Sequence, residues 1–402
     1  MNSWKTYRLG DLCDTISDTY KGCADEVVLI NTSDVLEGKC LNHTKEPNRN
    51  LKGQFKKTFK KYDILYSEIR PANKRFAYID FDTTNYIAST KLMVLRHNEK
   101  IEPLYLYYIL QSQSIIDELQ MLAESRSGTF PQITFAELSR LEVKLPKREV
   151  QRQILGILGA IDDKIENNRR INTNLELQAQ ALYKQWFVDF EFPNEEGKPY
   201  KSFGGKMVDS ALGPIPESWS VGDIYKYTKV IYGAPYKSSL FNEKKEGNPL
   251  IRIRDLKTFA PQYYTKEILP NTEFVNAGDV VAGMDAEFVP CLWMGEKGVL
   301  NQRCCKFVGK QDSISNYYVM FLVKPELEFV QSYKTGTTVS HLGKSDIDKF
   351  VVVQPPLTVI EKFSKIANAL LNNKANLAKE NITLATLRDT LLPKLMNGEI
   401  KM

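Results

Sequence analysis

The sequence predicts a mixed α+β protein in which two similar globular α/β domains are joined by two long antiparallel coiled-coil helices. Three observations support this fold class: the chain repeats itself once, each copy holds short strand-like runs followed by a helix, and each copy ends in a heptad pattern. Sustained heptads with polar flanks are typical of coiled coils. We therefore expect a dumbbell with pseudo-twofold symmetry.

Length and composition are those of an ordinary globular protein. The chain has 402 residues, of which 43% are hydrophobic and 26% charged, and this excludes a mostly disordered or fibrous protein. It holds no apolar run of roughly 18 residues, so no membrane-spanning helix is predicted. The first residues lack an apolar signal core, so we expect a cytoplasmic protein. The net charge of +5 permits an anionic partner without proving one.

Matching segments carry the repeat. Leu29–Val35 matches Leu250–Leu256, and Ser127–Thr129 matches Thr335–Thr337. Two copies of about 200 residues indicate a domain duplication and not a solenoid. The predicted boundaries are 1–145 for the first globular domain, 146–192 for the first spacer helix, 193–216 for a Gly/Pro-rich linker, 217–354 for the second globular domain and 355–402 for the second spacer helix.

Both copies share one order of elements. Short apolar runs between Gly, Asn and Asp predict strands, and Pro103 opens a helix in the first copy. The predicted strands include Val27–Ile30, Asp63–Tyr66, Lys91–Leu95, Val280–Ala282 and Cys305–Val308, with Leu141–Leu145 and Phe350–Val353 last in each copy. The predicted apolar helix faces are Leu104, Tyr107, Tyr108 and Leu110, then Tyr317, Tyr318, Phe321 and Leu322.

The long helices give the strongest pattern. In the first, the heptad positions are Ile154, Ile161, Asn168, Leu175 and Leu182, widened by Ile157, Ile165 and Ile171. In the second they are Phe363, Leu370, Leu377, Leu384 and Leu391, with Ile366 and Leu387 beside them. Such a stripe needs a partner. The partner is either the other long helix or the globular domain of the same copy. Pro393 is expected to interrupt the second helix before its last turn.

No catalytic or metal site is predicted. The spacing between Gly336 and Gly343-Lys344 does not fit a phosphate-binding loop, and the three histidines have no nucleophile or acid at a useful spacing. The six cysteines form no Cys-x-x-Cys pair. We therefore expect a protein that is not itself an enzyme.

Binding features are better represented. Lys56, Lys57 and Lys60 lie in a basic stretch interleaved with aromatic residues, which suits phosphate contacts. The loop from Ser67 to Arg75 is rich in side chains that read base edges, and its counterpart from Met284 to Glu287 differs in character. An ordinary solvated surface remains the alternative for each residue. The full candidate set is Asn31, Thr32, Lys56, Lys57, Lys60, Ser67, Arg70, Asn73, Lys74, Arg75, Gly128, Thr129, Gln132, Arg252, Arg254, Asp285, Glu287, Gly336, Thr337 and His341.

Five segments carry a resemblance to a known family: Leu145–Ile154, Ile161–Asn168, Trp186–Phe190, Asp209–Trp219 and Pro355–Leu357. With them, essentially the whole chain resembles the specificity (S) subunit of type I restriction-modification enzymes. The resemblance implies two target-recognition domains that each read half of a bipartite site in double-stranded DNA. It implies a coiled coil that sets the spacing and docks two methyltransferase subunits, with restriction/translocase subunits completing the nuclease.

The same resemblance implies that this chain holds no cofactor, because S-adenosylmethionine, ATP and Mg²⁺ would be bound by partner subunits. One departure concerns the junctions before the long helices: Lys147–Gln151 loosely matches the family's Glu-Gln motif, whereas Leu357–Glu361 lacks it. Two other hypotheses remain open. One is the specificity chain of a related enzyme whose partner fuses methylation and cleavage, and the other is a coiled-coil scaffold with protein-binding ends.

Overall fold

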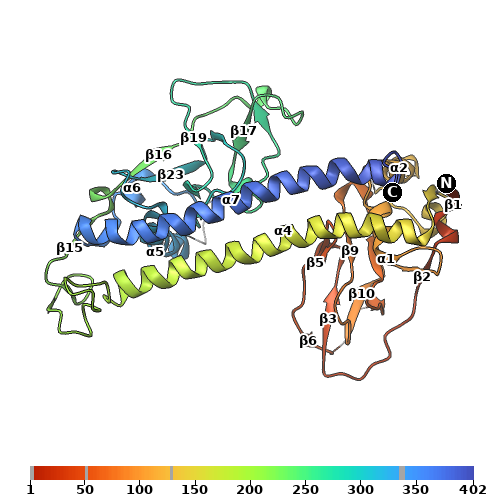
Figure 1. Cartoon of the computed structure of the whole chain (residues 1–402), viewed down its shortest axis with the longest axis horizontal. Helices are drawn as coiled ribbons and strands as arrows, with labels where there is room; N and C mark the ends of the chain where they lie inside the picture. Colours follow the sequence, from red (N-terminus) through yellow and green to blue (C-terminus); the bar gives the residue numbers. More distant parts are fainter. Residues whose placement is uncertain (1–3, 50–52, 127–129, 335–339) are drawn as a thin grey trace. The chain divides into compact units, whose positions relative to one another are not determined.

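The computed structural model describes residues 4–49, 53–126, 130–334 and 340–402. The chain forms two compact units: unit 1 comprises Met1–Asp163 and Ala385–Met402, and unit 2 comprises Lys164–Leu384 (Figure 1). These compact units divide both long helices, so the boundaries predicted at the ends of helices stay a prediction. Within the described residues, no helix has the length and apolar character needed to cross a membrane.

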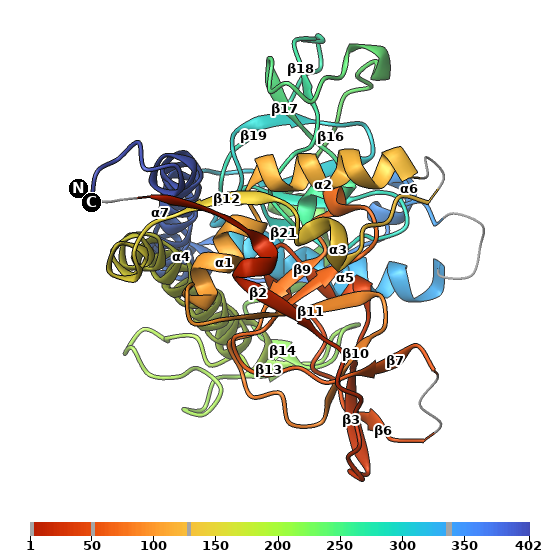
Figure 2. The ribbon, with the colours of Figure 1, turned by 90° about the vertical axis from the view of Figure 1, so that its right-hand side faces the viewer.

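Unit 1 contains two four-stranded sheets and two short strand pairs. The first sheet is antiparallel and has the order β2-β11-β8-β9: Cys13–Ile16, Leu92–His97, Ile64–Ser67 and Phe76–Tyr78. The second has the order β6-β3-β10-β7 (Figure 2): Glu46–Pro47, Glu26–Ile30, Tyr86–Ser89 and Phe55–Lys57. The short pairs are β1 with β12 and β4 with β5: Lys5–Arg8, Glu142–Leu145, Val35–Leu36 and Lys39–Cys40. Strands β3 and β10 are parallel.

In its described residues, unit 2 repeats the two four-stranded sheets and the β1–β12 pair of unit 1, but not the β4–β5 pair. Its antiparallel sheet has the order β16-β23-β20-β21: Thr228–Tyr232, Cys304–Gly309, Val280–Gly283 and Cys291–Leu292. The second sheet has the order β18-β17-β22-β19: Tyr264–Thr265, Asn248–Ile251, Gly298–Leu300 and Phe274–Val275. Strands β15 and β24 form a short pair, and β13 and β14 lie in the linker: Ser220–Asp223, Val351–Gln354, Met207–Val208 and Ile215–Pro216. Strands β17 and β22 are again parallel, which confirms the predicted duplication.

The shorter helices pack on these sheets. They are α1, α2 and α3 in unit 1 and α5 and α6 in unit 2: Pro103–Leu110, Gln113–Arg126, Phe135–Leu138, Asn316–Lys334 and Lys344–Ile347. The apolar face predicted for α5 is buried as expected, whereas the one for α1 was wrong in part. Leu104 and Tyr107 are only half-buried, while Tyr105, Leu106 and Ile109 lie in the core. Because α1 is apolar nearly all round, its sequence cannot indicate which side faces the core.

The two long helices are α4, Arg148–Tyr183, and α7, Leu357–Met396. Their existence and length agree with the prediction. The prediction that the flanking residues extend the buried stripe was largely wrong. Ile165 is buried, whereas Ile157, Ile171, Ile366 and Leu387 are between 37% and 47% exposed. A straight helix drifts relative to a heptad repeat, so residues flanking the stripe rotate out of the seam. The predicted interruption was also wrong, because α7 passes through Pro393 and ends at Met396.

Polar contacts show that α4 and α7 run antiparallel within unit 2. The Asn168 side-chain amide donates to Asn381 Oδ1 at 2.9 Å and to Glu380 Oε2 at 2.8 Å. Further along the pair, Lys374 forms an ion pair with Glu176. The residue numbers rise on one helix as they fall on the other. Asn168 is fully buried, and a buried polar residue in a helix seam favours one register at some cost in stability.

Both predicted partners of the long helices are present. Ile154 and Leu158 of α4 belong to the core of unit 1, and Phe363 of α7 belongs to the core of unit 2. Each helix therefore packs on its own globular domain near its start. The other long helix also contributes to each core, with Leu395 in unit 1 and Trp186, just beyond α4, in unit 2.

The junction before each long helix is built differently in the two copies. The buried Gln151 side chain accepts the Glu102 N–H at 2.9 Å and donates to the Pro146 carbonyl at 2.9 Å. In the second copy the Tyr227 hydroxyl donates to the corresponding carbonyl of Pro355, and Ile360 is fully buried. The glutamine of the family motif is therefore a buried residue in the first copy, and the second copy has Ile360 in its place.

A tight turn precedes β8 in unit 1 and β20 in unit 2, with different residues in the two turns. Tyr62 has φ +76° and Gly278 has φ +94°, and each precedes an aspartate that caps the turn. Asp63 Oδ2 accepts the Lys60 N–H at 2.7 Å, and Asp279 Oδ2 accepts the Asn276 N–H at 2.9 Å. Positive φ costs an L-residue roughly 1–2 kcal/mol, so glycine suits this position.

Two glycine substitutions should have opposite effects on stability. Gly278→Ala should lower the free energy of unfolding by about 1 kcal/mol, because alanine is strained at positive φ. Gly156→Ala lies inside α4 with no other atom within 4 Å of the added methyl, and it should raise stability by about 0.5–1 kcal/mol. Thermal and urea denaturation measure both changes. Shifts of the same sign for the two variants would contradict this account of the turn.

Candidate functional site

The loops that carry most candidate residues meet at one edge of each unit. In unit 1, β3 and β10 are parallel, so the chain leaves both strands at the same edge, and Ser67 at the end of β8 pairs with Leu92 at the start of β11. We call residues 31–34, 67–75, 89–91 and 130–133 the loop edge of unit 1. The loop edge of unit 2 consists of residues 252–255, 284–287 and 301–303, which follow β17, β20 and β22, together with residues 340–342, which precede α6.

The same backbone bonds hold both loop edges. In unit 1, Arg70 N–H donates to the Pro131 carbonyl at 3.1 Å and Ile133 N–H donates to the Glu68 carbonyl at 2.8 Å. In unit 2, Ala286 N–H donates to the Ser340 carbonyl at 2.9 Å and Leu342 N–H donates to the Met284 carbonyl at 2.7 Å. The central pairs are Ile69 with Gln132 and Asp285 with His341. The two units thus present different side chains on one backbone frame.

The loop edge of unit 1 is basic. Arg70 and Lys74 both have positive φ, +45° and +52°, and flank a short turn that contains the exposed Asn73. Arg75 reaches back to donate to the Ser33 carbonyl at 3.1 Å, which ties this loop to the turn after β3. In that turn, the Asn31 side chain accepts the Thr32 N–H at 2.8 Å. Gln132 Oε1 accepts from Lys91 Nζ at 3.4 Å.

The lysines of the predicted basic stretch lie outside this loop edge, and Ser67 lies within it but is buried. Lys57 Nζ is turned inward and donates to the carbonyls of Thr90 at 3.0 Å and Leu92 at 2.8 Å, and burial lowers its pKa. Ser67 is 3% exposed and bonds within its own turn. Lys60 is exposed but precedes β8, at the opposite end of the strand from Arg70. Lys56 is exposed on β7.

The predicted basic stretch is therefore divided by the fold: Lys56 and Lys60 are exposed, whereas the side chains of Lys57 and Ser67 are engaged in hydrogen bonds within unit 1. Strand pairing explains this outcome, because alternate residues of β7 and β8 point to opposite faces. A lysine whose ammonium donates to two carbonyl groups contributes to stability and has fewer donors left for a phosphate.

The loop edge of unit 2 carries paired charges. Asp285 contacts His341 Nδ1 at 2.6 Å and Arg303 Nε at 3.3 Å, and Glu287 contacts Lys257 Nζ at 2.8 Å. Arg303 and Lys257 were missed in the sequence, because each is distant along the chain from its partner.

The turn after β17 adds two arginines to this edge. Arg252 pairs with Asp255 at 3.4 Å and stacks on Tyr263 at 4.2 Å from the ring centre. Arg254 is exposed in the same turn. Arg252 is therefore committed to contacts within the unit, while Arg254 is open to solvent.

Four predicted residues, Gly128, Thr129, Gly336 and Thr337, lie outside the described residues. An ion pair joins the flanks of each such segment. Arg126 binds Glu137 at 2.9 Å in unit 1, and Lys334 binds Asp346 at 2.6 Å in unit 2. The two carboxylates also accept the N-cap N–H of α3 and of α6, from Thr134 and Gly343 respectively. Thr134 with Glu137 is a capping-box sequence signal that could have located Glu137, whereas Gly343 has no side chain to complete such a box.

The electrostatics of these two carboxylates are alike. Burial raises the pKa of Glu137, but hydrogen bonds from Thr134 and the charge of Arg126 leave that pKa below its ordinary value. Burial likewise raises the pKa of Asp346, but the hydrogen bonds from Lys334 and the Gly343 N–H lower it by more, so the pKa lies below its ordinary value. Both carboxylates are therefore more stable in the charged form when the protein is folded.

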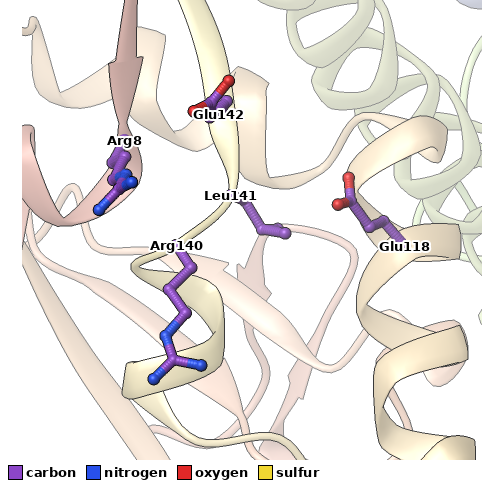
Figure 3. A pocket seen from close by; sticks show the side chains of 5 residues that line it. All are labelled: Arg8, Glu118, Arg140, Leu141 and Glu142. Atoms are coloured by element: carbon purple, nitrogen blue, oxygen red, sulfur yellow. The ribbon is translucent and has the colours of Figure 1, made fainter.

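A hollow on unit 1 is a separate feature. It has a volume of about 550 Å³ and is lined by Arg8, Glu118, Arg140, Leu141 and Glu142 (Figure 3). Two arginines and two glutamates balance in charge, and none of them belongs to the loop edge. The hollow is therefore separate from the loop edge, and its lining carries no excess of positive charge.

Comparison with known proteins agrees with this duplicated architecture of two loop-bearing units. The family described as "Type I restriction modification DNA specificity domain" matches residues 1–177 and 217–386. The chain belongs to this family. It is 31% identical to the HindI specificity subunit of Haemophilus influenzae over 100% of both chains, and 27% identical to the MjaIX specificity subunit of Methanocaldococcus jannaschii, covering 74% of this chain and 69% of that one.

A solved structure shares the fold. The crystal structure of the type I restriction-modification S subunit from M. genitalium matches with a TM-score of 0.54 and 14% identity, covering 98% of this chain and 96% of that chain. This likeness concerns the arrangement of the elements. The family match confirms the predicted family, and this likeness confirms the predicted fold class.

Removing either capping carboxylate should weaken its unit in a pH-dependent way. Glu137→Gln and Asp346→Asn should each cost about 1 kcal/mol of stability near neutral pH, the typical loss for a helix cap. A carboxylate with a lowered folded-state pKa contributes above its unfolded pKa of about 4, and its contribution disappears as the pH falls through the folded pKa. Urea denaturation at several pH values measures the difference in unfolding free energy between each variant and the wild type. A difference that grew as the pH fell would contradict the assignment.

Proposed function

We propose that this chain is the DNA-recognition subunit of a type I restriction-modification complex, in which each unit reads one half of a bipartite site in double-stranded DNA. The observation that carries the proposal is the pair of loop edges, which share one backbone frame but differ in side chains. Sequence is read by side chains at base edges, so two frames with unlike side chains suit two unlike half-sites. Family membership supports the same function.

Catalysis belongs to other subunits in this proposal. The names of the relatives describe specificity subunits, which suggests a role in recognition and assembly. Two methyltransferase subunits would bind S-adenosylmethionine, and restriction/translocase subunits would bind ATP and Mg²⁺. This chain would select the DNA site for them.

The long helices are proposed to set the gap between half-sites and to dock the methyltransferase subunits. Two observations support this role: α4 and α7 each start in one unit and end in the other, and their antiparallel pairing in unit 2 is fixed by Asn168 and Lys374. A helix of fixed register has a fixed length of about 1.5 Å per residue.

Reconstitution tests the function directly. The chain, combined with its methyltransferase subunit and S-adenosylmethionine, should methylate a bipartite site, and it should retard duplex DNA in a salt-dependent way. The chain alone, given S-adenosylmethionine, ATP and Mg²⁺, should neither methylate nor cleave DNA. Methyl transfer by a homogeneous preparation of the chain would overturn the assignment of catalysis to partners.

Arg70 should affect recognition while Lys57 should affect stability. Arg70→Ala should weaken binding to the recognised duplex by about 1–3 kcal/mol and relax one position in one half-site. Lys57→Ala should lower the free energy of unfolding by about 1–3 kcal/mol, because two carbonyls lose their donor, and should leave the preferred sequence unchanged. Lys60→Ala removes an exposed charge at the opposite end of β8 and should weaken binding to specific and random duplexes alike, as expected for a phosphate contact. Equal loss on specific and random DNA for Arg70→Ala would reassign Arg70 to phosphate contact.

Helix length should determine the gap. Four residues inserted after Asn172 in α4, matched by four after Ala378 in α7, add about 6 Å. Since duplex DNA rises roughly 3.4 Å per base pair, the gap should widen by one or two base pairs while the half-site sequences stay the same. The methylated-site pattern of the reconstituted complex is the readout, and a single insertion is the control for loss of register. An unchanged gap in an active double insertion would leave the helices as a docking surface only.

A further inference from the structure

Arg303 is an exposed arginine whose guanidinium is held by a carboxylate. It immediately precedes β23, and its Nε lies 3.3 Å from Asp285 Oδ2. The Arg303 side chain is 55% exposed and the Asp285 side chain 23% exposed. Within the described residues, the terminal nitrogens of Arg303 donate no hydrogen bond to another residue. The guanidinium is therefore held beside Asp285 while more than half of the Arg303 side chain stays exposed.

The same carboxylate also fixes His341. Asp285 Oδ1 lies 2.6 Å from His341 Nδ1, so each oxygen of Asp285 contacts one basic side chain. The imidazole is thereby oriented with Nδ1 toward Asp285, which leaves Nε2 for an external partner. Asp285 itself has both oxygens engaged, so it is better suited to position its neighbours than to contact DNA.

The backbone beneath this cluster is equally constrained. Met284 N–H donates to the Arg303 carbonyl at 2.8 Å, and Asp285 pairs with His341 across an isolated bridge. Ala286, the next residue, has φ +62° and bonds to Ser340. Three segments distant in sequence are thus held together before any ligand binds. Side chains fixed in this way lose less conformational entropy on binding.

We propose that Arg303 reads a guanine in the half-site recognised by unit 2, with His341 contacting an adjacent base and Asp285 as the positioning residue for both. This inference rests on the proposed function. Two parallel N–H donors of a guanidinium match the O6 and N7 acceptors that guanine presents in the major groove. Anchoring Nε on Asp285 leaves the Nη groups for that bidentate contact. A lysine could not reproduce it, because an ammonium is a point charge without the planar fork.

Unit 1 carries a different group at the same place. Glu68 N–H donates to the Lys91 carbonyl at 3.0 Å, as Met284 does to Arg303, so Lys91 corresponds to Arg303. Lys91 contacts Gln132, the counterpart of His341, and Ile69 takes the place of Asp285. The positioning carboxylate is therefore particular to unit 2, and the two half-sites should be read by different chemistry.

The test uses the full chain reconstituted with its methyltransferase subunit, with methylated sites identified by sequencing. Arg303→Ala should reduce methylation of the recognised site roughly 10- to 100-fold and relax one G·C position in one half-site only. Arg303→Lys should show the same relaxation, and Asp285→Asn should relax the same position. Lys310→Ala, an exposed lysine just past the other end of β23, is the matched control and should leave the site unchanged. Lys91→Ala should change the other half-site.

The possible failures are distinguishable. Wild-type protein that methylates no bipartite site would overturn the proposed function itself. Wild-type activity with an unchanged site in folded Arg303→Ala protein would overturn this inference alone. A uniform loss on all sequences would also overturn it, because it would make Arg303 a phosphate contact. Thermal denaturation of each variant shows that it is folded, and Arg303→Lys keeps the test decisive if Arg303→Ala is unstable.

Discussion

The rest of the structure depends on one constraint, the backbone pairing of two segments in each unit. The loop after β8 pairs with the segment before α3, and the loop after β20 pairs with the segment before α6. In both units, two hydrogen bonds and one isolated bridge lock this loop across a large separation in sequence. Backbone bonds are independent of side-chain identity, so the frame survives while Arg70, Asn73, Asp285 or His341 vary on it. A protein built this way can change what it recognises without refolding.

Polar groups buried in the helix seam serve a related purpose. Asn168 between α4 and α7, and Lys374 paired with Glu176, contribute less stability than apolar residues would. They permit only the register in which they meet their partners, as a buried asparagine does in coiled coils. In unit 1, Asp162 of α4 accepts a hydrogen bond from Tyr108 at 2.5 Å and from Arg388 of α7 at 3.0 Å. These contacts fix which residues of α4 and α7 face each other in each unit.

The duplication, the strands and the long helices could be predicted because each leaves a local pattern in the sequence. The interior role of Lys57 could not, since it depends on β7 pairing with β10 and on carbonyls of residues 90 and 92. Ile157 and Ile366 were misplaced because small differences in helical phase decide which residues flank a seam. Arg303 was missed because its partner, Asp285, is distant in the chain and only sheet pairing brings the two together.

Domain exchange tests the central claim that the two units read DNA independently. Residues 1–145 would be replaced by the matching segment of a relative, and the methylated sites of the reconstituted complex would be sequenced. Residues that pack against this segment, such as Ile154 and Leu395, would be kept. The account predicts that one half-site changes to the relative's sequence while the other half-site and the gap stay the same. A folded, active hybrid that changed both half-sites would contradict it.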